Sequence, residues 1–369
     1  MELLGLDVGT SHIKVVSIDR DKKNKLKKYA IGSSKSILNK ILSESESDLN
    51  VLAKSVKNFL LSEEIFTRQA VGIIPDNKVF TKLIRMPYIQ GKEFDDAVHW
   101  EAEEHLPERL SDVYLKYTVI SDNKSSESGG ILKKFTKNNE DNDDGNLVDV
   151  LLVAVPKHVV NKYLGILTKA GLEPVGLEPA STAVVRSLIY NEETASIPTI
   201  IADIGYSNVC FSLTVDGNVR FVRTINFAIA SMVNIISKEL DMSNTQATEY
   251  LYTYGMKETE LDGKIRAFIK PVVDIIIEEL KKSINFVERK SELIGKHHDK
   301  NRSVKRIIVN GGGALIPDLI FYFVQELSVE IEVANPWNLV TMSPEMQNSK
   351  LIDFGPLFST SVGAALKNI

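Results

Sequence analysis

The chain has 369 residues, of which 43% are hydrophobic and 25% charged, so it can bury a packed core and is expected to form two or three domains. Its net charge of −5 argues against a broad nucleic-acid surface. A single cysteine, Cys210, excludes an intrachain disulfide framework, the N-terminus lacks the basic start of a signal peptide, and no apolar run reaches the ~20 residues that span a bilayer, so we expect a cytoplasmic protein.

The first part of the chain alternates between strand and helix patterns. Its predicted elements are a β-branched run, a hairpin partner, a helix and a short strand, at 3–18, 26–31, 49–61 and 69–74. A different pattern begins at Lys78, where we expect an extended segment, a helix and two strands, at 79–86, 92–105, 114–120 and 147–155. Residues 121–146 are rich in Ser, Asn, Asp, Lys and Gly and predict a floppy hairpin loop.

Strand and helix signals alternate again from Lys157 to the end of the chain. The expected helices lie at 159–170, 180–190, 231–240, 244–254, 272–294 and 318–326. The expected strands lie at 174–177, 199–214, 218–226, 303–310 and 329–333.

An internal near-repeat carries most of the chemical information. Residues 6–13 (LDVGTSHI) and 202–209 (ADIGYSNV) both read apolar, Asp, apolar, Gly, any, Ser, any, apolar. Each is expected to join two strands through a tight turn, which is also what two ordinary Asp-Gly hairpins would look like. A paired copy at domain-scale separation instead favours two similar domains that clamp a polyphosphate between their turns.

The residue types of the repeat suit phosphate and Mg²⁺. Gly9 and Gly205 let the backbone approach an anion, and the turn N–H groups with the Ser11 and Ser207 hydroxyls can donate to phosphate oxygens. Carboxylates repel phosphate, so Asp7 and Asp203 are expected to hold Mg²⁺ through water. Lys14, in the strand after the first turn, either neutralises a phosphate or is a solvated strand residue.

A third motif follows a buried strand. In residues 307–314 (IIVNGGGA) the strand runs into Gly311, Gly312, Gly313 and Ala314. Successive glycines leave a bare backbone surface for an adenine or ribose, and the alternative is a flexible strand–helix turn.

In this order the three motifs resemble the phosphate-1, phosphate-2 and adenosine motifs of the actin-like ATPase superfamily. Residues 175–180 resemble the first interdomain connecting segment of that fold, and residues 363–366 resemble the second, where small residues let two helices cross closely. Glu279, Lys282 and Ser283 resemble its adenosine-side helix. The resemblance implies an α/β, two-lobed actin-like fold of two RNase H-like domains that binds ATP with Mg²⁺.

The resemblance also assigns roles to single residues. It adds Thr10 and Asn208 to the nucleotide-binding set named above. It places Glu178 where relatives orient the attacking water, so Glu178 is the candidate catalytic group, the alternative being a charged residue at a helix start. Asn208 stands where relatives usually have Thr, and 226–230 (NFAIA) lacks their Gly-Gly. These two departures predict at most a weak ATPase.

The expected domain boundaries follow from the same comparison. The first actin-like domain comprises 1–77 and 156–190, with an extra subdomain at 78–155 in the position that FtsA uses. The second comprises 191–240 and 303–355, with a helical adenosine-side subdomain at 241–302. Residues 356–369 return to the first domain.

A narrower resemblance points to one family. Residues 5–11, Met86-Pro87, 97–103 (AVHWEAE), 153–157 and 170–174 look like those of type IV pilus assembly proteins of the PilM family. The resemblance implies a cytoplasmic, ATP-binding scaffold, peripheral at the inner membrane, that binds the N-terminal tail of a PilN-like membrane protein and connects to pilus motor ATPases. It leaves self-association open.

Peptide capture in that family uses a groove between the first domain and the extra subdomain, which predicts peptide contacts here at five positions, Met86, Phe94, Val98, Trp100 and Leu106. The alternative function is an FtsA- or MreB-like filament former in division or cell shape. It is disfavoured because residues 363–369 form no amphipathic membrane helix. A small-molecule kinase of the same superfamily would need a catalytic Asp beside an acceptor pocket, for which we find no candidate.

Overall fold

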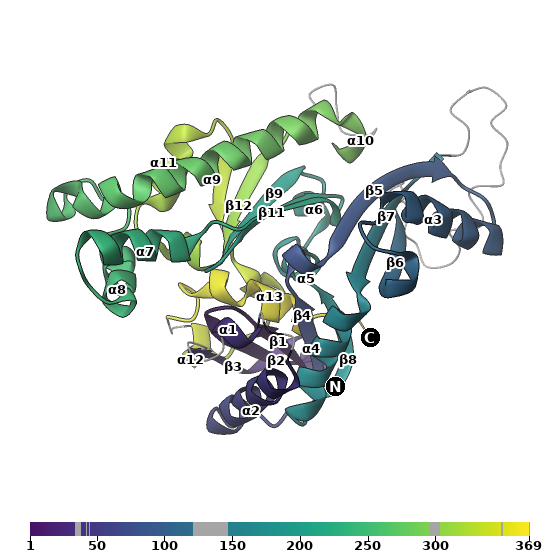
Figure 1. Cartoon of the computed structure of the whole chain (residues 1–369), viewed down its shortest axis with the longest axis horizontal. Helices are drawn as coiled ribbons and strands as arrows, with labels where there is room; N and C mark the ends of the chain where they lie inside the picture. The colour runs from purple at the N-terminus through teal and green to yellow at the C-terminus, as the bar shows by residue number, and fades with distance from the viewer. Residues whose placement is uncertain are drawn as a thin grey trace.

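The computed structural model describes residues 1–33, 38–41, 43, 45–120, 147–294, 303–347 and 350–368. They form two lobes, each built on a five-stranded sheet, and a smaller third unit at one side (Figure 1). The predicted loop 121–146 lies outside the described residues.

The sheet of the first lobe has the strand order β3-β2-β1-β4-β8. Its strands are β1 (Glu2–Val8), β2 (His12–Asp19), β3 (Lys25–Ser33), β4 (Gln69–Ile74) and β8 (Glu173–Pro179). β1 to β3 form an antiparallel meander, and β4 and β8 continue the sheet in parallel. α1 (Leu38–Ile41), α2 (Glu46–Ser62) and α4 (Lys157–Lys169) belong to this lobe, and the apolar sides of α2 and α4 share a buried core with β1.

The second lobe repeats this order as β11-β10-β9-β12-β13. Its strands are β9 (Thr199–Ile204), β10 (Val209–Val215), β11 (Asn218–Ile225), β12 (Arg306–Asn310) and β13 (Glu330–Val333). Its helices are α6 (Glu192–Ala195), α7 (Ile229–Glu239), α8 (Asn244–Tyr254), α9 (Lys264–Arg289), α10 (Ser291–Ile294) and α11 (Leu319–Glu326). α12 (Pro344–Gln347) instead lies beside β3 of the first lobe (Figure 1), where Met346 packs against a core that includes Val16 and Leu26. The short sequence repeat therefore marks equivalent hairpins, β1–β2 and β9–β10, in two similarly built sheets.

Two helices lie between the sheets, α5 (Ala180–Leu188) and α13 (Gly355–Ala365) (Figure 1). They cross so closely that a Cβ on Gly363 would lie 1.8 Å from the carbonyl oxygen of Ala183. α13 also presses on β1, where a Cβ on Gly5 would lie 1.9 Å from the carbonyl oxygen of Ser361. The small residues at the end of the chain thus allow the contact that joins the lobes.

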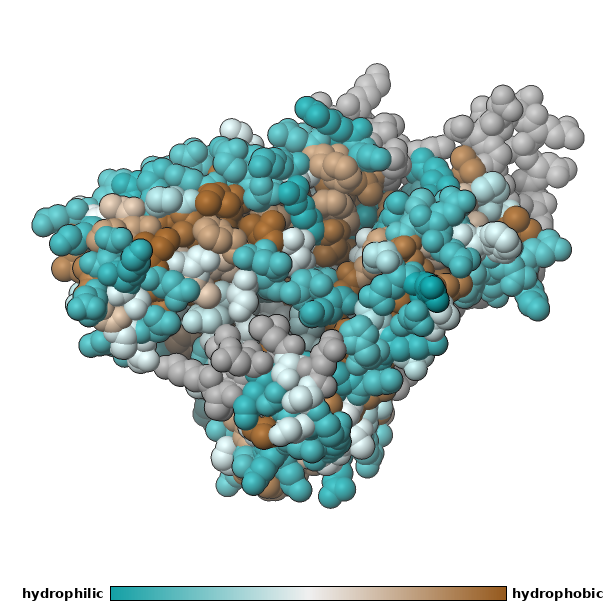
Figure 2. Space-filling view, viewed as in Figure 1, coloured by the Kyte–Doolittle hydropathy of each residue, from teal (hydrophilic) through white to brown (hydrophobic). Residues whose placement is uncertain are grey.

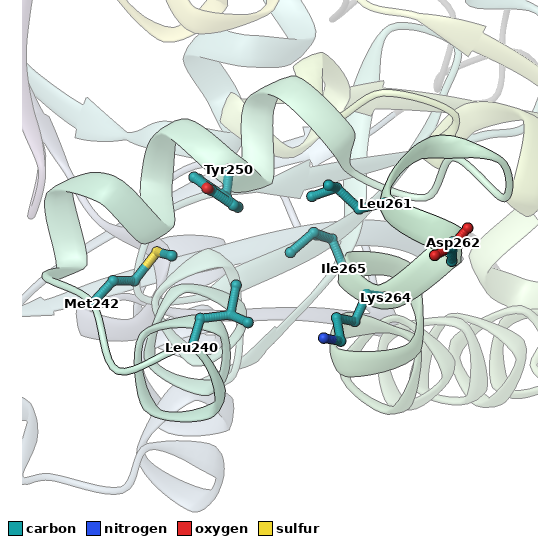
Figure 3. Close-up of a pocket in the computed structure, with 7 residues that line it drawn as sticks. All are labelled: Leu240, Met242, Tyr250, Leu261, Asp262, Lys264 and Ile265. Carbon is teal, nitrogen blue, oxygen red and sulfur yellow. The ribbon is translucent and has the colours of Figure 1, made fainter.

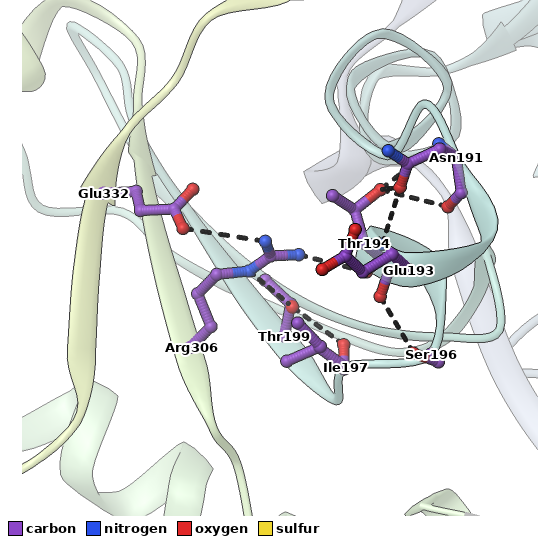
Figure 4. Close-up of polar contacts among 8 residues, drawn as sticks. All are labelled: Asn191, Glu193, Thr194, Ser196, Ile197, Thr199, Arg306 and Glu332. Atoms are coloured by element: carbon purple, nitrogen blue, oxygen red, sulfur yellow. Dashed lines mark hydrogen bonds and ion pairs between the residues drawn. The ribbon is translucent and has the colours of Figure 1, made fainter.

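Polar contacts at the start of β12 fix its register with the neighbouring strands β9 and β13 (Figure 4). The buried Arg306 donates from Nε to Thr199 Oγ1 at 3.1 Å and from a terminal nitrogen to the Thr194 carbonyl at 3.1 Å. Its other terminal nitrogen lies 3.6 Å from a Glu332 carboxylate oxygen, so one guanidinium ties β12 to β9, α6 and β13. This register places Asn310 opposite Asp203 at the other end of the pair.

The third unit is inserted between β4 and β8 of the first lobe. It is a three-stranded sheet, β5-β7-β6, covered by one helix. Its elements are β5 (Phe80–Pro87), α3 (Lys92–His105), β6 (Val113–Ile120) and β7 (Leu147–Pro156).

α9 differs from its prediction, because it begins at Lys264 rather than at residue 272 and ends at Arg289. Pro271 stands just before the predicted start, and proline disfavours a helix interior because it lacks the N–H that the helical hydrogen bonds need. Inside α9 the buried residues on either side of it, Ile269 and Val272, anchor the helix in the core of the second lobe, so packing overrides the local preference.

Candidate functional site at the meeting of the two turns

The two turns of the sequence repeat lie against each other. Both have the same tight geometry, because Gly9 donates its N–H to the His12 carbonyl at 2.9 Å and Gly205 donates its N–H to the Asn208 carbonyl at 3.0 Å. Across the lobes, the Ser207 hydroxyl donates to Thr10 Oγ1 at 2.9 Å. Hydroxyls and backbone amides of both turns are thus gathered at one place between the sheets.

A lysine and two aspartates form the charged centre of this place. Asp7 and Lys14 are paired neighbours on β1 and β2, and Lys14 Nζ lies 2.6 Å from Asp7 Oδ2. Burial lowers the pKa of Lys14, but the negative charges of Asp7 and Asp203 outweigh it and leave that pKa raised. Burial raises the pKa of Asp203 to about 6; the nearby Lys14 opposes this shift, and the carboxylate of Asp7 adds to it. One cation therefore serves both aspartates of the repeat.

The glycine motif closes against the second turn. Asn310 donates from Nδ2 to Asp203 Oδ1 at 3.1 Å, and its own Oδ1 is buried with no hydrogen-bond partner among the described residues. Gly311 has φ +77°, and a Cβ there would lie 2.5 Å from Asp203 Oδ1, so both the conformation and the approach require glycine. The Tyr252 hydroxyl donates to the Gly312 carbonyl at 3.3 Å, and Ala314 donates its N–H to the Gly311 carbonyl.

These groups fit a Mg²⁺-bound nucleotide. The set holds a cation for phosphate in Lys14, donor hydroxyls on both turns, and an unsatisfied amide oxygen on Asn310. Among the described residues no three His, Cys, Asp or Glu side chains are grouped to bind a metal directly. Asp7 and Asp203 therefore suit a hydrated Mg²⁺, which keeps several of its waters.

The candidate catalytic residue, Glu178, is tied to the two crossing helices. Its buried carboxylate receives two hydrogen bonds from Arg186, at 2.6 and 2.8 Å, and one from Lys367 Nζ at 2.7 Å. Arg186 also donates to the Gly363 carbonyl of α13 at 2.7 Å. With its oxygens held by two cations, Glu178 serves the interlobe contact, and its role in orienting water stays a prediction.

The predicted adenosine-side residues lie on α9. The Glu279 carboxylate pairs with Arg223 of β11 and with Lys282, whose Nζ is at 2.7 Å, and hydrogen bonding from Lys282 lowers the pKa of Glu279. The Ser283 hydroxyl donates to the Glu279 carbonyl at 2.9 Å. In the sheet, β10 and β9 lie between β11 and β12, which leads into the glycine motif. The contacts of Glu279 with Arg223 and Lys282 therefore do not connect the α9 residues to the glycine motif, the other predicted part of the adenosine site.

Sequence reasoning missed a buried carboxylate beside the turns. Asp76, just after β4, accepts the Ser181 N–H at 2.9 Å and its hydroxyl at 2.6 Å at the start of α5, and the Cys210 thiol of β10 at 3.5 Å. Burial raises the pKa of Asp76, opposed by the hydrogen bonds from Ser181. β4 pairs with β1 and β12 pairs with β9, the strands that lead into the two turns. Asp76 follows the end of β4 and Asn310 ends β12, and a polar residue at these strand ends is the sequence signal that could have identified both.

The predicted peptide contacts need a correction. Met86, Phe94 and Val98 are buried in the core of the third unit, between α3 and its sheet, which leaves little or none of their surface for a peptide. Leu106 is half-buried, and Trp100 has 77% of its surface exposed. The sheet of the third unit therefore covers the apolar side of α3.

A separate hollow lies in the second lobe, away from the turns. It has a volume of about 520 Å³, and the apolar side chains that line it come from the segments around α7, α8 and α9 (Figure 3). In the view of Figure 1, the surface over α7 to α9 shows apolar patches (Figure 2). None of the residues of the two turns or of the glycine motif lines this hollow.

Across the described ranges, no helix combines the length and the apolar character needed to cross a membrane.

Comparison with known proteins gives one family and several related folds. A family model described as type IV pilus assembly protein PilM matches residues 5–369. A solved structure described as a PilM–PilN type IV pilus biogenesis complex superposes with a TM-score of 0.80 at 24% identity, covering 99% of this chain and 98% of that one. No functionally curated protein matches the sequence.

Two more distant structures share the fold. The ethanolamine utilization protein EutJ from Carboxydothermus hydrogenoformans matches with a TM-score of 0.54 at 14% identity, covering 99% of this chain and 90% of that one. MreB 5 of Spiroplasma citri bound to AMPPNP matches with a TM-score of 0.52 at 11% identity, covering 98% and 94%.

Proposed function

The chain belongs to the family of type IV pilus assembly proteins PilM, and we propose that it is a nucleotide-binding scaffold that recruits a membrane-tethered partner to the pilus assembly complex. The family membership disfavours the alternative of a filament former in division or cell shape. The observation that carries the nucleotide part of the proposal is the contact between Ser207 and Thr10, which brings the two turns to one place.

The nucleotide is ATP, held by residues of both lobes. Lys14 neutralises phosphate charge, the Thr10 and Ser207 hydroxyls donate to phosphate oxygens, and Asp7 and Asp203 accept from the waters of a Mg²⁺ ion. The bound metal supplies positive charge that offsets phosphate repulsion. Because ligand groups come from both lobes, binding favours the arrangement in which the turns are close. The related MreB structure holds a nucleotide analogue, which supports this assignment.

Titration calorimetry with MgATP tests the site. We expect Asp7→Ala and Lys14→Met to weaken binding at least tenfold, because each removes a charge at the turns. Glu249→Gln, an exposed carboxylate on α8, is the matched control and should bind like the parent chain. Parent-like affinity in both site variants would show that the nucleotide lies elsewhere.

The partner is the N-terminal tail of a PilN-like membrane protein, by analogy with the related complex. Tail binding then holds the chain at the cytoplasmic face of the inner membrane, where pilus motor ATPases would be further partners. Two apolar side chains of the third unit keep surface for such a tail: the half-buried Leu106, just after α3, and the half-exposed Tyr114 of β6, whose ring lies under Lys157 Nζ at 5.7 Å. Lys157 begins α4, so this surface adjoins the first lobe.

Fluorescence polarisation with a labelled PilN-type tail peptide tests the partner. Leu106→Asp combined with Tyr114→Ala should weaken binding at least tenfold, since both changes remove apolar contact area. Phe66→Ala removes another strongly exposed aromatic from the first lobe and should have no effect. If the tail binds the double variant normally, the groove is not at this junction.

A further inference from the structure

The outer face of α3 carries an aromatic side chain that the fold does not use. Phe94, Val98 and Ala102 point into the core of the third unit. Trp100 lies about 200° around the helix from Val98, on the opposite side, and is exposed to 77%. No other large apolar side chain among the described residues is as exposed. Tryptophan is enriched at the centres of interfaces, where its large area becomes buried.

Four carboxylates surround Trp100 on the same face. Glu93, Asp96, Glu103 and Glu104 stand seven and four residues before it and three and four after it, so all lie within about 60° of it around the helix. All four are exposed, and within the described part of the chain none forms an ion pair or side-chain hydrogen bond. The stripe is about 17 Å long, from the helical rise per residue.

Helix stability does not account for this stripe. Glu103 and Glu104 are in the last turn of α3, where the helix dipole disfavours anions. Glu93 and Asp96 stand three residues apart and also repel each other. The other acidic groups of α3 do have local partners, since Glu101 pairs with His105 at 3.3 Å and Asp95 accepts from Tyr117. The helix dipole favours Glu93 in the first turn, but the charges of Glu103 and Glu104 are a cost to the isolated helix, which an oppositely charged partner would offset.

We propose that the outer face of α3 docks a Lys- or Arg-rich segment of a partner protein, with one cation stacked on Trp100 and its neighbours paired with the stripe. Tryptophan is the strongest cation–π acceptor among the side chains, and the surrounding carboxylates attract the same cations. An anionic membrane surface is repelled by this face. The surface goes beyond the proposed tail-binding junction, because it lies on the side of α3 that points away from the sheet.

Tryptophan fluorescence of the full chain measures docking directly. The chain has two tryptophans, and Trp337 is 4% exposed, so a ligand at the surface should perturb Trp100 alone. The probe is a synthetic 12-residue peptide with Lys or Arg at half of its positions, compared with the same peptide carrying Glu instead. We expect saturable quenching by the basic peptide only, with affinity falling at least tenfold on raising salt from about 50 to 300 mM.

Labelled peptide and polarisation extend the test to variants. Trp100→Ala and the pair Asp96→Asn/Glu104→Gln should each weaken binding of the basic peptide at least tenfold. The control pair Glu249→Gln/Glu345→Gln removes two exposed carboxylates elsewhere and should bind like the parent chain. Circular dichroism checks that each variant keeps the parent's helix content.

Three results would overturn the proposal. The first is equal binding of the basic and acidic peptides, and the second is parent-like binding of the basic peptide by both α3 variants. The third is a parent chain that self-associates in sedimentation and becomes monomeric with Trp100→Ala, because the occupant would then be a second copy. Trp100→Ala should leave the PilN-type tail affinity unchanged, so failure here and failure of the tail-binding proposal are distinguishable.

Discussion

Three aspartates, the buried Asp76 and the half-buried Asp7 and Asp203, meet one lysine between the lobes, and this imbalance sets the chemistry of the site. Asp7 is paired with Lys14, Asp76 is held by Ser181 and Cys210, and Asp203 receives a hydrogen bond from Asn310. The charge of Lys14 and the hydrogen bond from Asn310 offset the burial of Asp203 only in part, and its pKa rises to about 6. At neutral pH it is mostly ionised, at a cost that a nearby cation would offset.

We predict that Asp203→Asn stabilises the chain without nucleotide at pH 7.5 by about 1–3 kcal/mol, because it removes a charge that folding must bury. The folded pKa of Asp203 lies above its unfolded value of 3.8. Its contribution to stability is therefore greatest below pH 3.8 and is lost as the pH rises through about 6. The advantage of the variant should accordingly shrink as the pH falls from 6 towards 4.

Urea unfolding at pH 7.5 and 4.5 measures this difference. Asp353→Asn, at an exposed position, is the control and should change the free energy of unfolding little at either pH. A constant difference between parent and Asp203→Asn at the two pH values would show that the carboxyl has an ordinary pKa.

Among the elements, the crossing of α5 and α13 is the tightest contact described. Because a Cβ on Gly363 would nearly coincide with the Ala183 carbonyl oxygen, even alanine there requires the helices to separate. We predict that Gly363→Ala lowers the free energy of unfolding by about 2–4 kcal/mol, measured by urea titration.

Gly165 in α4 gives a matched control for this change. A Cβ there would meet only Leu49, at 3.5 Å, so Gly165→Ala should be neutral or stabilising by up to about 1 kcal/mol. If Gly363→Ala were as mild, the helices would have to cross less closely than they do here.

At the scale of elements, sequence patterns predicted what depends on local order. The repeat predicted two equivalent tight turns, and alternating patterns found the strands that flank them, because these signals lie within a few residues. The small residues near Gly363 likewise indicated a close helix crossing.

The patterns could not tell which surface covers an apolar face. The stripe of Phe94 and Val98 looks the same whether a peptide or a sheet lies against it, and the sheet of the third unit proved to be the partner. Glu178 likewise stands at the expected strand end, but its partners Arg186 and Lys367 come from later in the chain. Contacts between segments far apart in the sequence decide these roles, and the spacing of residues within one segment does not reveal such contacts.

In the molecule as a whole, a buried ion network joins the third unit to the second lobe. Arg85 on β5 and Asp149 on β7 face each other and form two hydrogen bonds, at 2.7 and 3.0 Å. Arg220 on β11, which is 1% exposed, reaches the same carboxylate at 3.5 Å. The unit inserted in the first lobe is thus held to β11 of the second lobe, the second strand after the 205–208 turn.

We predict that Asp149→Asn destabilises the chain by about 3–5 kcal/mol, because it removes the carboxylate that Arg85 and the buried Arg220 share and leaves Arg220 paired only with the more exposed Asp216, at 3.7 Å. Adding Arg220→Met to that variant should recover part of the loss. Urea unfolding gives the energies, and hydrogen exchange should show faster exchange in β5 and β7. If Asp149→Asn had the same free energy of unfolding as the parent chain, the ion pairs of Asp149 would make no net contribution to stability.

The same network gives a route by which nucleotide and tail binding affect each other. β10 and β11 follow the second turn directly, so a shift of that turn on ATP binding moves the strand that carries Arg220, and through Asp149 the third unit beside the proposed tail groove. Coupling between two sites is reciprocal, so ATP should change tail affinity by the same factor as the tail changes ATP affinity. We predict that Asp149→Asn/Arg220→Met binds each ligand alone within threefold of the parent but loses most of that factor. Calorimetric titration of each ligand with and without the other measures it, and an unchanged factor in the double variant would route the coupling through α5 and α13 instead.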